Sequence, residues 1–234
     1  SFVRQAAITK IAEEAESLVQ VAHRYDGDRV TFYEDDKKGC SDDDSLDSAV
    51  RSVRHPNRYC QILNYQIPNH SDLRAIYLWP PLTEFIRQVL NVEHLFLSQC
   101  PHLALTMKVA YEGDTDGWHY DPNDGVITLV LQTADNGGEF EYAPNIRNKN
   151  DQNYAGVDRL FKSPDVEATR PMLEPGTFTF FNGRHSMHRV RPVGSTRQPR
   201  IVSIFSFDQR PDHFFAQSYI DKLRSFPQGP PIVD

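Results

Sequence analysis

Two residues in the stretch Trp118–Pro122 have the types and spacing needed to bind a metal ion. His119 and Asp121 are two positions apart, and in an extended strand residues i and i+2 point to the same face. Both side chains can therefore reach one ion. A third candidate ligand, His188, opens a later predicted strand. Two histidines and one carboxylate form a facial triad, which leaves open positions on a ferrous ion for a co-substrate and O₂.

His185 is a competing candidate for the third ligand. It lies three residues before His188, so in a strand the two side chains would face opposite ways. We therefore assign the ligand role to His188. His185 is expected in a turn or beside the ligands.

A co-substrate with two carboxylates needs a cation, and an arginine offers a two-pronged hydrogen-bonding fork to a carboxylate. Between Glu174 and Asp208 there are five arginines and no acidic residue. Arg200 opens the apolar run 201–205, so a rigid strand can aim it inward, and we favour it as the carboxylate clamp. Arg197 is the second choice, because it lies in a predicted turn. The other three, Arg184, Arg189 and Arg191, are expected at the surface.

Five further residues are candidates for contact with co-substrate or substrate. Tyr111 ends the strand before His119 and can hydrogen-bond a co-substrate oxygen, or it is simply a packed core tyrosine. Trp118 would form a wall of the site. Glu139 would face a cationic substrate or else point outward from its strand. Asn123, in the turn after Asp121, and Ser203, on the Arg200 strand, complete the predicted substrate residues.

The elements that must position these residues follow from hydrophobic periodicity and turn signals. Residues 2–25 are predicted to be a helix, and residues 34–47 form an acidic loop. A strand over 59–67 and two short helices over 71–90 follow, with Ser71 as N-cap and Pro80–Pro81 between the helices. The later predicted strands cover 103–111, the His119 stretch, 126–132, 139–142, 177–181, 188–191 and 200–207. Residues 144–170 are expected to be an irregular active-site loop or lid, and residues 214–223 a short helix.

Many short strands with Gly, Pro and Asn turns, preceded by helices, predict a mainly β fold with flanking helices. We expect a double-stranded β-helix, or jelly roll, with N-terminal helices packed on one sheet. Residues 1–234 would form one domain, in which 1–100 is a helix-rich support and 101–210 is the jelly-roll core. Such a barrel has an open mouth suited to a buried metal.

The composition of the chain disfavours some classes of binding partner. The chain has 234 residues and a net charge of -7, with a pI near 5.7, which disfavours nucleic acid and anionic membrane surfaces. The three cysteines form no CxxC pair, so a reducing, cytoplasmic location is expected. No run is apolar and long enough to span a membrane. These features predict a small-molecule partner and leave the oligomeric state open.

Several motifs in this order resemble the iron(II)- and 2-oxoglutarate-dependent oxygenases. More narrowly, they resemble the group that contains the radical halogenases and the hydroxylases of free amino acids. The resemblance covers about residues 58–210. It is carried by Trp118-His119-x-Asp121, by Gly137–Tyr142 with Pro144–Arg147, by Pro175-Gly176, by Gly183–Val190 with Pro192-Val193, and by Arg200–Val202.

The resemblance implies iron(II) on His119, Asp121 and His188, with Arg200 on the distal carboxylate of 2-oxoglutarate. It also implies O₂-dependent oxidation of a C–H bond in a free amino acid or derivative, with release of succinate and CO₂. In the halogenating branch a small residue replaces the metal-binding carboxylate and leaves room for chloride. Because Asp121 is present, we expect hydroxylation, or else desaturation or oxidative cyclisation at the same site.

Two other classes stay open. A cupin-like metal enzyme on a similar barrel would need no 2-oxoglutarate, but the sequence lacks the usual HxHxxxxE motif. A non-catalytic jelly-roll binding module would make the histidines incidental. A nucleic-acid demethylase of the same superfamily is disfavoured by the acidic pI.

Overall fold

The structure is a computed structural model that describes residues 3–32, 45–121, 126–212 and 214–231. Its helices are α1 (Gln5–Leu18), α2 (Ser45–Ser52), α3 (Asp72–Tyr77), α4 (Pro80–Leu90), α5 (Tyr154–Lys162), α6 (Pro164–Glu167) and α7 (Gln217–Arg224). The strands are β1 (His23–Val30), β2 (Arg54–Ile62), β3 (Phe96–Leu97), β4 (Leu105–Ala110), β5 (Thr115–His119), β6 (Val126–Gln132), β7 (Phe140–Ala143), β8 (Phe178–Phe181), β9 (Met187–Val190) and β10 (Arg200–Asp208).

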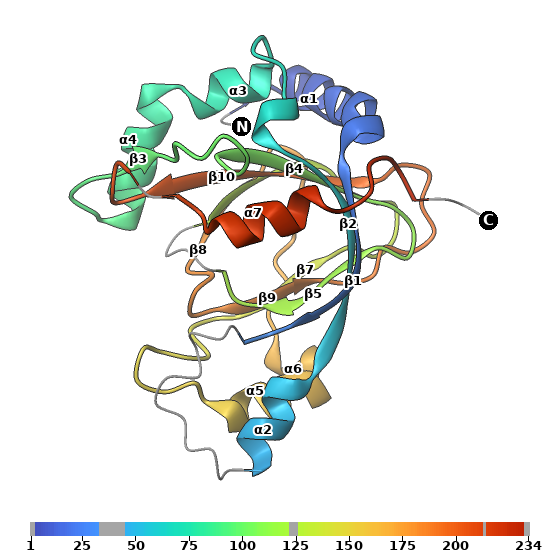
Figure 1. Cartoon of the computed structure of the whole chain (residues 1–234), viewed down its shortest axis with the longest axis vertical. Helices are drawn as coiled ribbons and strands as arrows, with labels where there is room; N and C mark the ends of the chain where they lie inside the picture. The colour runs from blue at the N-terminus through green and yellow to red at the C-terminus, as the bar shows by residue number, and fades with distance from the viewer. Residues whose placement is uncertain (1–2, 33–44, 122–125, 213, 232–234) are drawn as a thin grey trace.

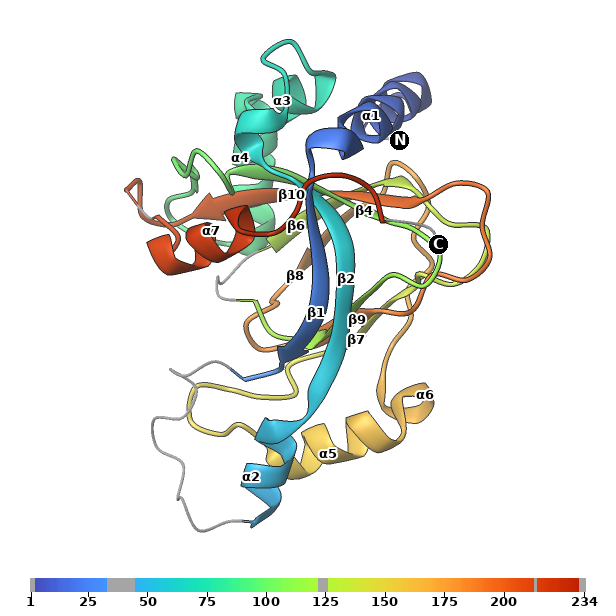
Figure 2. The same cartoon turned by 45° about the vertical axis from the view of Figure 1, so that its right-hand side comes forward.

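The strands form one curled antiparallel sheet in the order β7-β9-β5-β2-β4-β10-β6-β8, with β1 added on β2 and β3 on β10. The sheet folds over on itself. In Figures 1 and 2, β4, β6 and β10 form an upper layer, β5, β7 and β9 a lower one, and the long β1–β2 pair runs between the layers. The predicted fold class, a jelly-roll core with flanking helices, is confirmed.

The helices α1, α3 and α4 cover the outer side of the upper layer, whereas α2 lies at the opposite end of the molecule beside α5 (Figure 1). α1 buries Ile8, Ile11, Ala12 and Ala15 on one face, the spacing that an amphipathic helix requires, and packs against β4 and β6. The resulting core is continuous with buried residues of the strands beneath it: Leu105, Met107, Ile127, Leu129, Ile201 and Phe205. The prediction of helices on one sheet is therefore correct, and the opposite face of this layer is free to line a cavity.

Local signals placed several elements correctly. Ser71 caps α3 by accepting a hydrogen bond from the Leu73 amide at 3.2 Å, and Pro80 opens α4 at the helix position where its missing N–H costs nothing. The strands over 126–132 and 200–207 are also found as predicted. No helix in the described part of the chain combines the length and the apolarity that a membrane crossing requires.

Two predictions about elements are wrong. The helix expected over 2–25 ends at Leu18, and His23–Val30 is instead strand β1. This polar segment is extended because it pairs along its whole length with β2, a tertiary effect that propensity cannot show. β1 and β2 place strands of the sheet on the N-terminal side of residue 100, within the expected helical support.

The segment 144–170 is not an irregular lid, because it contains α5 and α6. Asn153 caps α5 by accepting a hydrogen bond from the Gly156 amide at 3.1 Å. Tyr154, Val157 and Leu160 form its buried face. Most of the predicted acidic loop, residues 34–44, lies outside the described residues, and α2 begins at Ser45.

His55, on β2, makes the stability of the protein depend on pH. Burial, together with the nearby guanidinium groups of Arg189 and Arg29, lowers the pKa of His55 to about 4. The unfolded chain takes up a proton below about pH 6.5, whereas the folded chain does not. The stabilisation by neutral His55 is therefore complete above that pH and is lost as the pH falls towards 4.

Replacing His55 by Leu should remove this part of the pH dependence, which amounts to at most about 3 kcal/mol between pH 6.5 and 4. Urea unfolding of both proteins at several pH values across this window measures it. Equal losses of unfolding free energy in the two proteins would contradict the prediction.

Candidate metal centre

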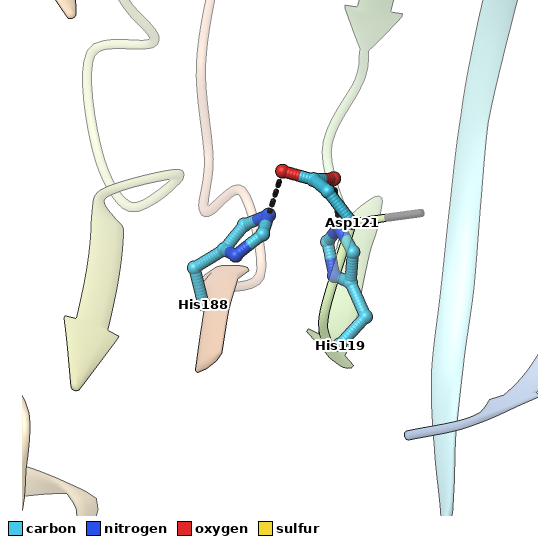
Figure 3. A group of neighbouring side chains, drawn as sticks. All are labelled: His119, Asp121 and His188. Atoms are coloured by element: carbon cyan, nitrogen blue, oxygen red, sulfur yellow. Dashed lines mark ion pairs between the residues drawn. The ribbon is translucent and has the colours of Figure 1, made fainter. Parts of the chain in front are cut away.

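The structure brings His119, Asp121 and His188 together. One ligand atom of each residue lies within 4.8 Å of the others, although 67 positions separate the last two in the sequence. His119 ends β5 and His188 lies in β9, and the two are directly paired across the sheet. Figure 3 shows the Asp121 carboxylate between the two imidazole rings.

Asp121 reaches the site by a different route from the one its spacing suggested. β5 ends at His119, so the i, i+2 rule of a strand does not apply to Asp121. Its backbone amide instead donates a hydrogen bond to the Gly183 carbonyl at 3.0 Å. This contact holds the residue against the loop that leads into β9.

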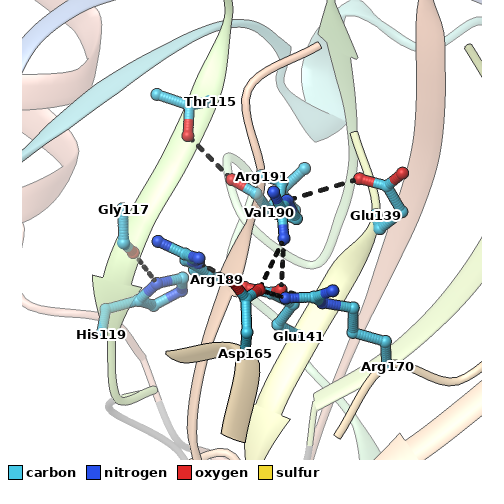
Figure 4. Close-up of polar contacts among 10 residues, drawn as sticks. All are labelled: Thr115, Gly117, His119, Glu139, Glu141, Asp165, Arg170, Arg189, Val190 and Arg191. Carbon is cyan, nitrogen blue, oxygen red and sulfur yellow. Dashed lines mark hydrogen bonds and ion pairs between the residues drawn. The ribbon is translucent and has the colours of Figure 1, made fainter. Parts of the chain in front are cut away.

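Both histidines are oriented in the same way. Nδ1 of His119 donates to the Gly117 carbonyl at 2.7 Å (Figure 4), and Nδ1 of His188 donates to the Ser186 carbonyl at 3.0 Å. A carbonyl can only accept, so each Nδ1 carries the proton and each Nε2 presents a lone pair. The Nε2 atoms face Asp121, at 3.9 Å from Oδ1 for His119 and 3.5 Å from Oδ2 for His188.

The three residues fit a divalent cation. Oδ2 of Asp121 is buried and has no hydrogen-bond partner within the described part of the chain, a costly arrangement unless a cation is bound. Burial, with smaller contributions from Arg29 and His188, holds the pKa of His119 well below its usual value, so the ring is neutral and able to coordinate. Two imidazoles and one carboxylate on one side of an ion suit non-haem iron(II).

Asp116 supports the site from behind, and the sequence did not reveal it. It is buried, and its carboxylate pairs with Arg29 at 2.8 Å and with Lys108. One oxygen lies 3.8 Å from Nδ1 of His119. Lys108 could have indicated a buried acidic residue nearby, because it is the one charged residue of strand β4. A charge in a buried strand requires a partner of opposite charge.

A cavity of about 80 Å³ joins the three residues to Arg200. Its walls are mostly apolar and include Val130, Phe140 and Phe181. The Phe181 ring meets the His188 ring edge-on, with centroids 4.8 Å apart. The site is therefore a small chamber whose mostly apolar walls carry the candidate ligands and three cations, Arg58, Lys108 and Arg200. Arg58 pairs with Asp26 at 3.3 Å, and Lys108 pairs with Asp116.

Arg200 is the notable charge in this chamber. Its side chain comes from the first residue of β10 and is only 9 % exposed. No hydrogen bond or ion pair from its guanidinium is found among the described residues, and burial lowers its pKa to about 10, only partly offset by Asp116. A buried arginine without an acidic partner is suited to an anionic ligand.

Arg197, the second choice for the clamp, lies outside the chamber. Its side chain is 92 % exposed and pairs with Asp135 at 3.1 Å. Ser203 also points away from the chamber. It is fully buried and donates to the Thr106 carbonyl at 3.2 Å, because alternate residues of β10 face opposite sides and Arg200 lies on the chamber side.

The remaining predicted residues do not line the chamber. Trp118, one residue before His119, faces the opposite side of β5 and lies in a separate apolar cluster, where Arg189 stacks 4.6 Å from its ring. Tyr111 packs against the main core. Glu139 borders a neighbouring cavity instead, and the half-buried His185 lies outside the chamber. Asn123 lies outside the described residues.

Gly183 creates the space that the Asp121 carboxylate occupies. A Cβ at this position would overlap Oδ2 and crowd the rest of the Asp121 side chain. Gly183 does not have a positive φ, so its importance is steric. The glycine in the Gly183–Val190 motif is therefore part of how the Asp121 carboxylate is positioned.

Replacing Gly183 by Ala should displace the carboxylate and weaken binding of Fe(II) or Co(II) by about 10–100-fold, the range found when groups that orient metal ligands are lost. Isothermal titration of the metal-free protein measures it. Gly27→Ala is the matched control, because nothing lies within 4 Å of a Cβ added there. Unchanged affinity in Gly183→Ala would refute the steric role.

Comparisons with known proteins agree with this architecture. The sequence profile of the halogenase D family matches residues 41–219. No curated protein matches the sequence. Many solved structures are similar to this chain, three of which are described below, and at their low sequence identity the likeness concerns the fold alone.

The first is the non-heme alpha ketoglutarate dependent carbocyclase SnoK from nogalamycin biosynthesis, with 11 % identity and a TM-score of 0.55 over 99 % of this chain and 87 % of that chain. The second is the epimerase SnoN from the same biosynthesis, with 13 % identity and a TM-score of 0.53 over 99 % and 88 %. The third is EctD from S. alaskensis, with 13 % identity and a TM-score of 0.51 over 88 % and 70 %.

The family match spans well over half of the chain and includes the two histidines, the aspartate and the buried arginine described above. The fold around these residues is a jelly roll with a small chamber between its layers. On this basis the chain belongs to the halogenase D family.

Proposed function

We propose that the protein is a non-haem iron(II)- and 2-oxoglutarate-dependent oxygenase. His119, Asp121 and His188 would hold the iron, and Arg200 would bind the distal carboxylate of 2-oxoglutarate. The observation that carries the proposal is the buried guanidinium of Arg200, which lies in the same chamber as the three ligands and forms no ion pair with a described carboxylate. Family membership and the fold support it.

The residues of the chain would act by positioning and by excluding water. Gly117 and Ser186 fix the tautomers of the two histidines. Asp116 would steady His119, and the chamber walls would shield the reacting groups from solvent. When bound, iron with 2-oxoglutarate and O₂ would supply the oxidation of an unactivated C–H bond, with release of succinate and CO₂.

We further propose hydroxylation as the outcome. Asp121 supplies a carboxylate at the position that a halide would need, so oxygen transfer is favoured over chlorination although the family bears the name of a halogenase. Desaturation and oxidative cyclisation use the same site and are the alternatives. The structural neighbours include a carbocyclase and an epimerase, so this fold is compatible with more than one outcome.

The substrate we propose is a small molecule, a free amino acid or a simple derivative. The support is the resemblance of the Gly137–Tyr142 and Gly183–Val190 segments to enzymes of that group. The limited size of the chamber agrees with a small substrate.

Anaerobic addition of Fe(II) and then 2-oxoglutarate tests the enzyme class. A visible charge-transfer band is expected, and its absence would favour a cupin-like enzyme without 2-oxoglutarate or a binding module. Succinate release is then screened across free amino acids in the presence of O₂ and chloride. Mass analysis of the product distinguishes a gained oxygen from a gained chlorine or a loss of two hydrogens.

A further inference from the structure

The curled sheet does not close into a barrel. β7 pairs with β9 and β8 pairs with β6, and no ladder joins β7 to β8 in the described part of the chain. We call this gap between the two end strands the seam. Phe140 of β7 and Phe181 of β8 meet across it, with ring centroids 5.2 Å apart. The seam is thus closed by side chains, which can move apart without breaking a strand ladder.

A short segment, residues 170–175, crosses the seam, and we call it the strap. On one side it is anchored to β7, because the backbones of Thr169 and Tyr142 exchange two hydrogen bonds of 2.8 and 3.0 Å. On the other side it is anchored to β6, where Gly176 donates to the Val130 carbonyl at 2.8 Å. Both ends of the strap are therefore fixed to the sheet, one on each side of the opening.

An ionic cluster strengthens the β7 end of the strap. Arg170 pairs with Glu141 of β7 and with Asp165 of α6 (Figure 4). Glu141 is fully buried and is also bound by Arg189 at 2.5 Å and by Arg191 at 3.2 Å. A buried carboxylate with several arginine partners forms a rigid anchor, so the middle of the strap, and not its ends, is free to move.

The strap separates two cavities. The outer cavity, of about 340 Å³, is bordered by residues 133–139, by 171–173 of the strap and by Arg200. The inner cavity is the chamber described above. Four residues line both cavities: Val130, Phe140, Leu173 and Arg200. Leu173 is therefore the strap residue that lies between the outer cavity and the chamber.

Arg200 borders both the chamber and the outer cavity. Gly138 lies against the Arg200 side chain, and a Cβ on Gly138 would come within 3.0 Å of its Cδ. Both Gly137 and Gly138 have positive φ, at 69° and 71°, which disfavours side chains at this turn. The turn therefore leaves Arg200 uncovered by side chains on the side of the outer cavity.

The charges of the outer cavity favour an anion. Its two acidic residues are both paired, Asp135 with Arg197 at 3.1 Å and Glu139 with Arg191 at 3.8 Å. Arg200 has no such partner among the described residues. A buried cation without an acidic partner at the inner end of a cavity draws anions towards it.

From this arrangement we infer that the seam is the passage by which 2-oxoglutarate reaches Arg200 and succinate leaves, with Leu173 as its plug. The inference rests on the proposed function. It gives dicarboxylates their own route through the outer cavity, entering beside the arginine that binds the distal carboxylate.

A plug has a kinetic signature. A residue that only blocks a passage changes the free-energy barrier between the free and bound states and leaves the free energies of both states unchanged. It therefore changes the association and dissociation rates by the same factor. A residue that contacts the bound molecule changes mainly the dissociation rate, and therefore the Kd. Measuring both rates distinguishes the two roles.

The test is anaerobic stopped-flow mixing of the Fe(II)-loaded protein with 2-oxoglutarate, followed through the charge-transfer band. Leu173→Ala should raise both rates by roughly tenfold, within the range over which association rates vary among variants of one site, and leave the Kd unchanged. Leu173→Trp should lower both rates. Val166→Ala, an 82 % exposed apolar residue on α6, is the control and should bind at wild-type rates.

A changed Kd with an unchanged association rate would overturn the passage, because Leu173 would then be a binding contact. Wild-type rates in both Leu173 variants would overturn it as well. Thermal unfolding verifies that each variant is folded, and the Ala variant tests the inference even where the Trp variant does not fold. Absence of the band in wild-type protein would instead refute the proposed function.

Discussion

Replacing His188 by Ala is expected to abolish Fe(II)-dependent succinate formation and to weaken metal binding by more than about 100-fold, since loss of a ligand exceeds the effect of losing a group that orients one. The described part of the chain offers no substitute, because only His119 and Asp121 of the cluster would then remain as ligands. Titration with Co(II), followed by succinate assays with Fe(II), measures both effects.

His185→Ala is the matched control for this experiment. The two histidines are three residues apart in the same motif, but only His188 belongs to the cluster of possible metal ligands. The control should retain metal affinity. Full Fe(II)-dependent turnover in His188→Ala would refute the assignment of the third ligand.

Replacing Arg200 by Met is expected to weaken 2-oxoglutarate binding by about 30-fold or more, because truncating one partner of a buried charge pair costs about 2–5 kcal/mol. Methionine keeps much of the side-chain volume and removes the charge. Metal affinity should be retained, since Arg200 is not among the ligand residues. Titration of the anaerobic Fe(II) protein with 2-oxoglutarate gives the Kd directly.

Arg197→Met provides the comparison, because it removes the same charge three residues away. Its side chain is 92 % exposed and paired with Asp135, so 2-oxoglutarate binding should stay at the wild-type level. A loss of affinity in Arg197→Met with none in Arg200→Met would reverse the assignment of the clamp.

The sequence alone determined the main features of the candidate site. The spacing of His119 and Asp121, and His188 at the start of a later strand, identified the three residues that the structure brings together. The position of Arg200 before an apolar strand also distinguished it from Arg197. The three residues could be grouped from the sequence because residue chemistry is a local property, whereas the role of Arg200 stays a prediction.

Other features depend on which segments meet, and only the tertiary structure decided them. Asp121 is held by Gly183 across a loop, and Asp116 became visible as a supporting residue only when Lys108 and Arg29 were placed around it. Ser203 and Trp118, predicted as substrate residues, do not line the chamber, because one residue along a strand reverses the direction of a side chain. The strap depends on the meeting of β7 and β8, the two end strands of the curled sheet. No local sequence pattern predicts that contact.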